Sequence, residues 1–243
     1  MIRKGDTVSA DLCHKKELLK SFYCVYSDWV KRFPLACRKG CAACCTQSVT
    51  MTSLEGEIVL DFIKVQGREK WLRAELAESI PGKSRPLLTT NQFAEACLNQ
   101  LDVDSNAFGC WDFTPCIFLE ENICSIYEVR PFGCRSFGSV VRCTEDRTAE
   151  MAPIHLTVNI VLSQIIEHLN SDNGYWSGMM DILYSLVNSD LVKVYLMQAR
   201  PVPGFLLEPQ EVREIHVLLK KLREQSSDMG SLGDLIDNFM PIL

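Results

Sequence analysis

Apolar residues recur at helical spacing along most of this chain. Between residues 11 and 32 they form a broad stripe, and Pro34 ends that pattern. A second apolar stripe follows Thr52, which forms a capping-box signature with Glu55 three residues later. We therefore expect a first helix over 11–32 and a second helix that begins after Thr52 and runs to about residue 77.

Further helices are expected beyond these two. Gly67 is expected to divide the second helix, because glycine is costly inside a helix. A short helix is expected over 91–101, with Thr90 or Asn91 as its N-cap. The last hundred residues contain no cysteine and show apolar stripes over 153–170, 175–187, from about 209 onwards and over 231–239.

The segment 116–126 has a different pattern. Two short apolar runs flank Glu-Glu-Asn, which is typical of two strands joined by a tight turn. The predicted fold is mainly α, or α+β with one small β-hairpin that carries Cys116 and Cys124. We expect a metal-stabilised, cysteine-rich helical domain with an N-terminal helix over residues 1–150. The helices of 151–243 are expected to form an extension that packs on it or serves a protein partner.

Composition and charge narrow the class of protein. Apolar residues make up 47% of the 243 residues, which is enough for a core, and the formal net charge is −6. No basic run exceeds two residues, which argues against a nucleic-acid binder. No apolar run approaches the roughly 20 residues that cross a bilayer, and the N-terminus lacks the apolar region of a secretory signal. We expect a soluble cytoplasmic protein that binds neither nucleic acid nor membrane.

The 12 cysteines change this picture most. In a reducing compartment they are expected to be metal ligands, redox thiols or buried apolar residues, not disulfides. Two groups stand out, the first being Cys37, Cys41, Cys44 and Cys45 and the second Cys116, Cys124, Cys134 and Cys143.

The first group has two interpretations. Its spacing matches the apolar stripe of a helix, which would need no metal. However, Gly40 lies inside the run and every position of the stripe is a cysteine. Thiolates are the soft ligands of zinc and of iron–sulfur clusters, and Cys41-x2-Cys44 is a short chelating spacing. The second group is widely spaced, so we expect the two groups to meet and share metal.

The vicinal pair limits the geometry. Side chains of Cys44 and Cys45 diverge in a helix or a strand, so we do not expect them to share one mononuclear ion. Either they serve two metals or one of them is not a ligand. Eight thiols would satisfy two four-thiolate sites, or one cluster with thiols left over.

Several other residues near the two groups are interpreted as follows. Cys13, Cys24, Cys97 and Cys110 are interpreted as packing residues. His155 is expected to be packed or exposed and not a ligand. Cations beside the cysteines are candidates to offset thiolate charge, namely Arg38, Lys39, Arg130, Arg135 and Arg142.

The cysteine pattern resembles the YkgJ-like cysteine-cluster family, whose members are described as zinc- or iron-chelating proteins with a CxxCxxCC motif. The resemblance rests on Cys37-x3-Cys41-x2-Cys44-Cys45, on Pro115-Cys116-Ile-Phe-Leu119 and on Cys124-Ser-Ile-Tyr-Glu-Val-Arg-Pro-x2-Cys134-Arg-Ser-Phe137. The first gap is three residues here and two in the family motif. The resemblance implies that seven of these cysteines are family cysteines and that Cys143 completes a set of eight.

The resemblance also bears on function. It implies a metal-binding domain that holds zinc or an iron–sulfur cluster. Flagellin lysine N-methylases carry a similar motif and are regarded as iron–sulfur enzymes that use S-adenosylmethionine, so a protein-modifying enzyme is a second hypothesis. A thiol redox sensor is the third. No catalytic residue and no cofactor-binding residue other than the thiols can be named from the sequence.

Overall fold

A computed structural model describes residues 4–38, 40–79, 86–104, 112–144, 146–188, 196–225 and 230–239. As predicted, these residues are mainly α-helical with a small amount of β-structure. The helices are α1 (Lys4–Val30), α2 (Ser53–Val65), α3 (Glu69–Ala77), α4 (Thr90–Leu98), α5 (Phe132–Ser136), α6 (Pro153–Leu169), α7 (Met179–Val187), α8 (Val212–Arg223) and α9 (Ser231–Phe239). The strands are β1 (Thr50–Thr52), β2 (Leu119–Glu120), β3 (Ile123–Cys124), β4 (Tyr175–Gly178) and β5 (Met197–Gln198), and η2 (Tyr127–Val129) is a single 3-10 turn.

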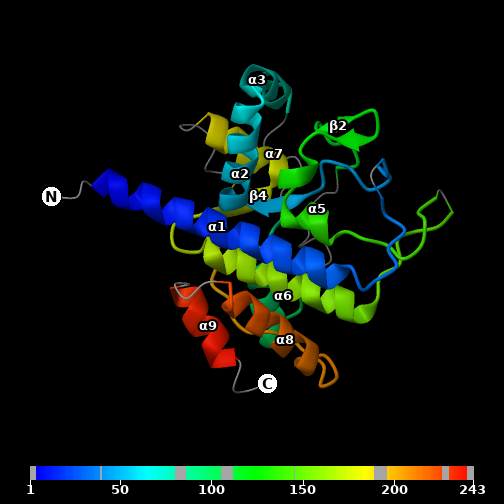
Figure 1. Ribbon diagram of the computed structural model, residues 1–243, viewed down its shortest axis with the longest axis vertical. Helices are drawn as coiled ribbons and strands as arrows, with labels where there is room; N and C mark the ends of the chain where they lie inside the picture. Colours follow the sequence, from blue (N-terminus) through cyan, green and yellow to red (C-terminus); the bar gives the residue numbers. More distant parts are fainter. Residues whose placement is uncertain are drawn as a thin grey trace.

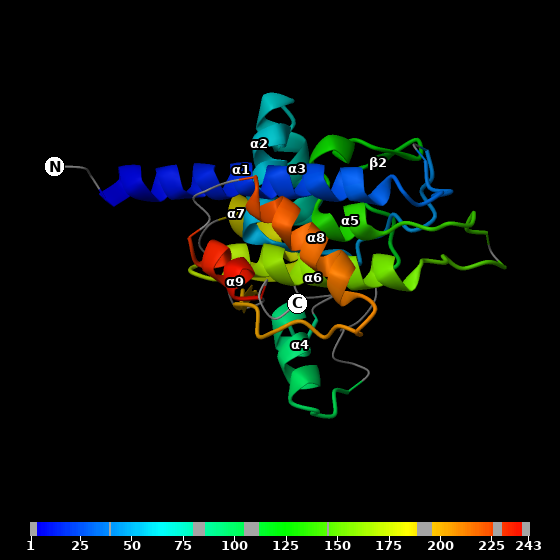
Figure 2. The same ribbon diagram turned by 60° about the horizontal axis from the view of Figure 1, so that its bottom comes forward.

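Helices α1 and α6 lie side by side through the middle of the molecule (Figure 1). The buried face of α1 includes Leu19, Phe22 and Tyr26, and it shares one core with the apolar faces of α6, α8 and α9. Helix α4 packs against α6, on the side away from α1 (Figure 2). The helices beyond residue 150 thus complete the core of the N-terminal helix, while the boundary at residue 150 remains a prediction.

A second core lies beneath α2, α3 and α7. Met51, Val59, Leu72 and Ile182 belong to it, and Phe118 from the β2–β3 hairpin is fully buried there. Residues of the hairpin, including Cys116 and Cys124, pack against this core. The hairpin is therefore anchored to the body of the protein by apolar burial, and its position does not depend on the thiols alone.

A three-stranded antiparallel sheet, which the sequence pattern did not reveal, connects the two halves of the chain. Strand β4 lies between β1 and β5, with Met51 opposite Ser177 and Trp176 opposite Met197. The predicted helix over 175–187 is therefore wrong at its start, since residues 175–178 are a strand and helix α7 begins at Met179. Strand pairing with distant residues outweighed the local helical spacing.

The junction of β1 and α2 follows the predicted signature. Thr52 ends the strand and caps the helix, with its side chain accepting from the Glu55 backbone and the Glu55 side chain accepting from the Thr52 backbone. Gly67, at a φ of +66°, separates α2 from α3 as expected. Three more helix starts differ from expectation. Helix α1 begins at Lys4 and not near residue 11, Thr89 caps α4 in place of Thr90 or Asn91, and α8 begins at Val212, three residues after Pro209.

Gly56 on α2 marks the closest approach of α2 to α7. A β-carbon added there would lie 2.7 Å from Cγ2 of Ile182 and 2.7 Å from Cδ1 of Leu186. We expect Gly56→Ala to lower the free energy of unfolding by about 1–2 kcal/mol, because the overpacking cost exceeds the gain in helix propensity. Urea denaturation measures this change. Val65→Ala, on the same helix at an 85% exposed position, should change stability by less than about 0.5 kcal/mol, and equal effects would contradict the packing argument.

In the described part of the chain, no helix combines the length and the apolar character that a membrane span requires.

Candidate metal centre

The first cysteine group lies on consecutive turns and not on a helix. Cys41 N donates to Arg38 O at 2.9 Å, and Cys45 N donates to Ala42 O at 3.0 Å. Gly40 has a φ of +87°, a conformation that glycine adopts without strain and that interrupts any helix. The helical-stripe interpretation of Cys37–Cys45 is therefore wrong. The turns leave Cys41 and Cys44 exposed and Cys37 and Cys45 half-buried.

The second group comes from three neighbouring elements. Cys116 lies three residues before β2, Cys124 ends β3, and Cys134 lies in the short helix α5. The predicted hairpin is present, with Leu119 opposite Cys124, but it carries Cys116 on the approach to its first strand and not within it. Glu121 and Asn122 form its turn at φ values of +49° and +64°.

The two groups meet at the backbone, as the sequence predicted. Cys116 N donates to Cys45 O at 3.0 Å, and Gln47 N donates to Thr114 O at 2.9 Å. Thr46 and Pro115 form an antiparallel bridge between these two bonds. Residues some seventy positions apart are therefore held as a short two-stranded ladder at the point where each carries a thiol.

Three thiols receive backbone hydrogen bonds. The Phe118 amide donates to the sulfur of Cys116, and the Ile126 amide donates to the sulfur of Cys124. In both cases the donor follows the cysteine by two residues. Ser139 N donates to Cys37 Sγ at 3.3 Å. Amide donors stabilise a thiolate over a thiol, and such bonds orient metal-bound sulfur. The local backbone thus fits the needs of a thiolate ligand.

Electrostatic contacts divide the thiols into two sets. Cys45, Cys116, Cys124 and Cys134, here the inner set, interact with one another. Cys37, Cys41 and Cys44, here the outer set, form the other group. Burial, followed by repulsion from neighbouring thiolates, raises the pKa of Cys134, and burial raises the pKa of Cys116 to about 11.

The vicinal pair lies where the two sets adjoin. The Cys44 thiol donates a hydrogen bond to the Cys45 sulfur, which lowers the pKa of Cys45 and raises that of Cys44. Cys44 interacts with Cys37 and Cys41, whereas Cys45 interacts with Cys116, Cys124 and Cys134. The two alternatives that the sequence leaves open, two metals or one thiol that is not a ligand, both remain predictions.

Residues 36–154 match the model of the CxxCxxCC family, described as a putative zinc- or iron-chelating domain. These residues form a CxxCxxCC domain. The match covers both cysteine groups, α2 to α5 and the first residues of α6. No curated protein and no solved structure matches the chain.

One arginine of the CxxCxxCC domain, Arg130, lies beside the inner set. Arg130 interacts with Cys45, Cys124 and Cys134, and its guanidinium stacks 3.9 Å from the ring centre of Tyr127. Its Nε is buried and has no hydrogen-bond acceptor among the described residues. An uncompensated donor beside four thiols fits a centre that becomes anionic when it binds metal.

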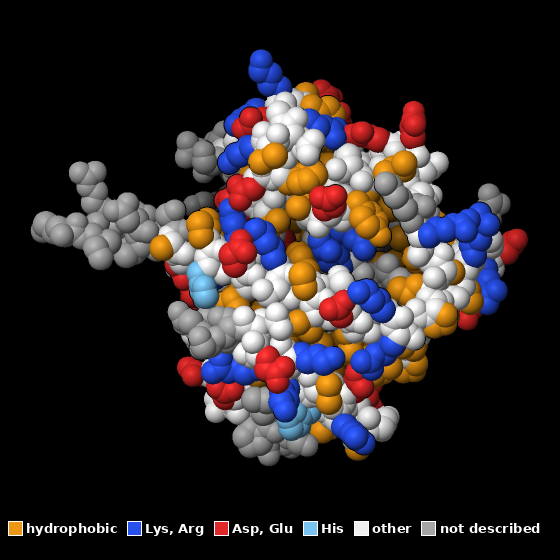
Figure 3. Space-filling model, viewed as in Figure 1, with side chains coloured by type: hydrophobic (Ala, Val, Ile, Leu, Met, Phe, Trp, Pro, Cys, Tyr) orange, Lys and Arg blue, Asp and Glu red, His pale blue; other side chains and the backbone are white. Residues whose placement is uncertain are grey.

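The other candidate cations differ in position. Arg135 of α5 donates from Nε to Arg130 O at 2.8 Å, and its guanidinium lies 4.2 Å from the ring centre of Tyr23. These contacts connect α5 to the preceding loop and to α1. Arg38 and Arg142 are exposed, and Lys39 lies outside the described residues. Figure 3 shows Lys and Arg side chains gathered on the edge where the loops around these residues project.

The ligand assignment itself remains a prediction. Among the described residues, no three His, Cys, Asp or Glu side chains are already close enough to hold one ion. Cys143 is half-buried beside the Thr144–Arg147 bridge. The inner set is thus the better supported half of the predicted eight ligands.

The remaining cysteines were only partly predicted. Cys13 and Cys24 do lie on one face of α1, but that face is exposed, so their assignment to the core is wrong. The large apolar residues Leu19, Phe22 and Tyr26 take the buried face, because they gain more from burial than a small thiol does. Cys97 is half-buried, and Cys110 lies outside the described residues.

His155 lies in the core, as a packed residue. Its ring stacks on Phe33 at 4.9 Å, its Nε2 lies 2.9 Å from Tyr26 Oη, and its exposed fraction is 0%. Burial lowers the pKa of His155 below its ordinary value of 6.5. The unfolded chain therefore binds the proton more readily, so the stability that neutral His155 contributes is present above pH 6.5 and is lost as the pH falls through the lower folded-state pKa.

We expect His155→Gln to flatten the loss of stability on acidification below pH 6.5, because glutamine does not titrate. The experiment is urea denaturation of the metal-free protein at several pH values, which avoids acid release of metal. His216→Gln, on α8, controls for loss of an imidazole elsewhere. The same slope in wild type and His155→Gln would rule out His155 as a source of acid sensitivity, and buried His168 would be examined next.

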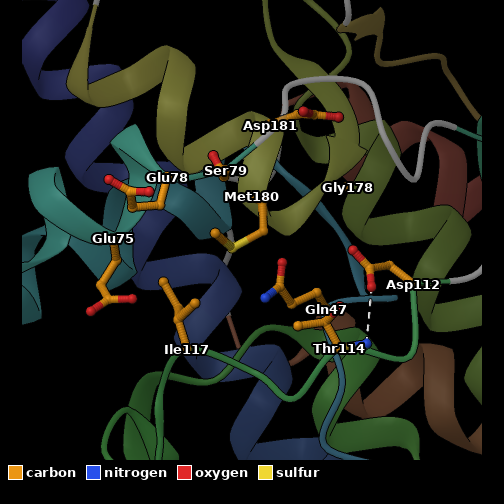
Figure 4. A pocket seen from close by; sticks show the side chains of 10 residues that line it. All are labelled: Gln47, Glu75, Glu78, Ser79, Asp112, Thr114, Ile117, Gly178, Met180 and Asp181. Atoms are coloured by element: carbon orange, nitrogen blue, oxygen red, sulfur yellow. Dashed lines mark hydrogen bonds between the residues drawn. The ribbon is translucent and has the colours of Figure 1, made fainter.

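A pocket of about 230 Å³ adjoins the ladder that carries Cys45 and Cys116 (Figure 4). Gln47, Thr114 and Ile117 form its wall on that side, and Met180 lies across from them. Four carboxylates also line it, namely Glu75, Glu78, Asp112 and Asp181. Sequence reasoning missed this pocket because its residues come from separate segments with no common spacing.

Proposed function

We propose that this chain is a metal-binding protein whose CxxCxxCC domain holds zinc or an iron–sulfur cluster through thiolates from two separated cysteine groups. The observation that carries the proposal is the Cys45–Cys116 backbone ladder, which joins the groups. Four thiols of the inner set match the four-thiolate ligation of structural zinc and of common iron–sulfur clusters. Arg130 would offset part of the resulting negative charge.

The metal is proposed to stabilise the fold. Cys45 and Cys116 belong to loops, Cys124 to a two-residue strand and Cys134 to a five-residue helix, so little regular structure fixes them. A shared metal would tie these segments together, since binding energy at a structural site is also folding energy. The described cysteines are free thiols, which agrees with a reducing, cytoplasmic compartment.

Metal analysis of protein purified without oxygen tests the proposal. A colourless protein with zinc bound to thiolates would identify a zinc protein, and a brown protein with iron and acid-labile sulfide would identify a cluster protein. Protein that contains neither metal, and that takes up neither on reconstitution, would refute the proposal.

We expect Cys41→Ser to distinguish metal bound at the outer set from metal bound at the inner set. Cys41 belongs to the exposed outer set, so its loss should reduce metal at that set and leave the inner-set metal in place. Elemental analysis of Cys41→Ser and Cys116→Ser beside wild type measures this. Equal and complete metal loss in both variants would show that the thiols serve one common centre.

A second candidate function is an iron–sulfur-dependent enzyme that modifies a protein side chain. The pocket beside the Cys45–Cys116 ladder favours it, because an enzyme needs space for a substrate next to its metal, and the four carboxylates suit a cationic substrate group. Calorimetry of the cluster-loaded protein with S-adenosylmethionine tests this candidate. The absence of both a heat of binding and a thermal shift would count against it.

A further inference from the structure

Glu55 is a buried carboxylate whose hydrogen bonds exceed the needs of its own helix. It is 4% exposed, and its Oε2 accepts from Thr52 N at 2.7 Å and from Thr52 Oγ1 at 3.0 Å, which completes the capping box of α2. Its Oε1 plays no part in that box. It accepts instead from Tyr23 Oη at 2.8 Å and from Phe132 N at 2.7 Å.

These bonds connect Glu55 to the thiols. Phe132 is the first residue of α5, whose third residue is Cys134 of the inner set. Tyr23, the other donor to Oε1, lies beneath the guanidinium of Arg135. An added β-carbon on Gly133 would lie 3.1 Å from Thr50 O, so α5 also packs tightly on β1. Glu55 is thus the polar contact that fixes the start of the Cys134 helix against α1 and β1.

Only a carboxylate can make both connections. Two backbone amides, those of Thr52 and Phe132, donate to different oxygens of Glu55. A glutamine has one acceptor oxygen and one NH2 group, so one amide would lose its partner. A buried amide without an acceptor is costly, and the cost would be relieved by movement of α5.

We propose that Glu55 is a positioning residue of the metal centre, holding the Cys134 helix in the place where its thiol can join the inner set. This inference rests on the proposed metal-binding function and assigns a role to a residue outside the cysteine motif. Partners that orient metal ligands typically change metal affinity by about 10–100-fold when removed.

Two variants of the full chain test the inference. Glu55→Gln leaves one of the two backbone amides, that of Thr52 or that of Phe132, without an acceptor and changes the side-chain volume little. Gln92→Ala is the control. The Thr89–Gln92 capping box of α4 has the same local geometry, but it does not include the hydrogen bond to α5 that Glu55 accepts. Zinc affinity is measured by competition with a chromophoric chelator. In the metal-free chain, alkylation of Cys134 is measured by peptide mass spectrometry relative to Cys97 on α4.

Glu55→Gln is expected to weaken zinc binding by about 10–100-fold and to accelerate Cys134 alkylation, while Gln92→Ala leaves both at wild-type values. Wild-type behaviour of Glu55→Gln, or the same changes in Gln92→Ala, would overturn the inference. Faster Cys134 alkylation with unchanged zinc affinity would also overturn it. If the wild-type chain binds no zinc, the zinc form of the proposed function fails, and the alkylation rates alone decide whether Glu55 positions Cys134.

Discussion

Replacing Cys124 with serine is expected to abolish metal binding at the inner set and to lower the free energy of unfolding by on the order of 5 kcal/mol. Cys124 lies on β3 and accepts a hydrogen bond from the Ile126 amide. It also interacts with Cys45 and Arg130, so its thiolate is central to the inner set. A serine hydroxyl is a poor ligand for the metals that thiolates hold. Elemental analysis and urea denaturation of the same preparations measure both effects.

The exposed cysteines of α1 provide matched controls. Cys13→Ser and Cys24→Ser make the same chemical change at solvent-facing positions, so they should keep the wild-type metal content and change stability by less than about 0.5 kcal/mol. With metal removed by a chelator, Cys124→Ser and wild type should unfold at similar urea concentrations. Wild-type metal content in Cys124→Ser would show that Cys124 is not a ligand.

Phe118→Ala is expected to lower the free energy of unfolding by about 3–5 kcal/mol, the usual cost of emptying a fully buried aromatic site. The Phe118 ring is 0% exposed and packs edge-on against Trp71, with ring centres 5.8 Å apart. Its amide also donates to Cys116 sulfur. Loss of the ring should therefore loosen the hairpin and reduce metal affinity along with stability.

Phe113→Ala separates this effect from a general loss of aromatic surface. Phe113 precedes the same ladder but is 77% exposed, so its removal should change stability by less than about 0.5 kcal/mol. Urea denaturation with and without a chelator measures both variants. Equal stability of Phe118→Ala and wild type would contradict the view that apolar burial anchors the hairpin.

Features governed by local physics were predictable from the sequence. The first helix, the break at Gly67, the Thr52–Glu55 capping box and the hairpin turn all depend on residues within one or two turns of one another. The meeting of the two cysteine groups was also predicted, but from chemistry, because thiols so placed in a reducing compartment need a common partner.

Features governed by distant contacts were not predictable. Residues 175–178 carry a helical pattern yet form β4, because β1 and β5 pair with them. The exposed face of α1 carries Cys13 and Cys24 because larger apolar residues occupy the buried one. Glu55 was predicted as a capping residue, whereas its second oxygen reaches Phe132, 77 residues away, which no local spacing reveals.

X-ray absorption at the metal edge of the purified protein tests thiolate ligation most directly. Ligation by the thiols predicts a first coordination shell of about four sulfurs, at about 2.3 Å if the metal is zinc. Iron would add a second shell of iron neighbours if it is held as a cluster. A first shell dominated by oxygen or nitrogen would contradict metal binding by the thiols, because the cysteines of the CxxCxxCC domain would then not be the ligands.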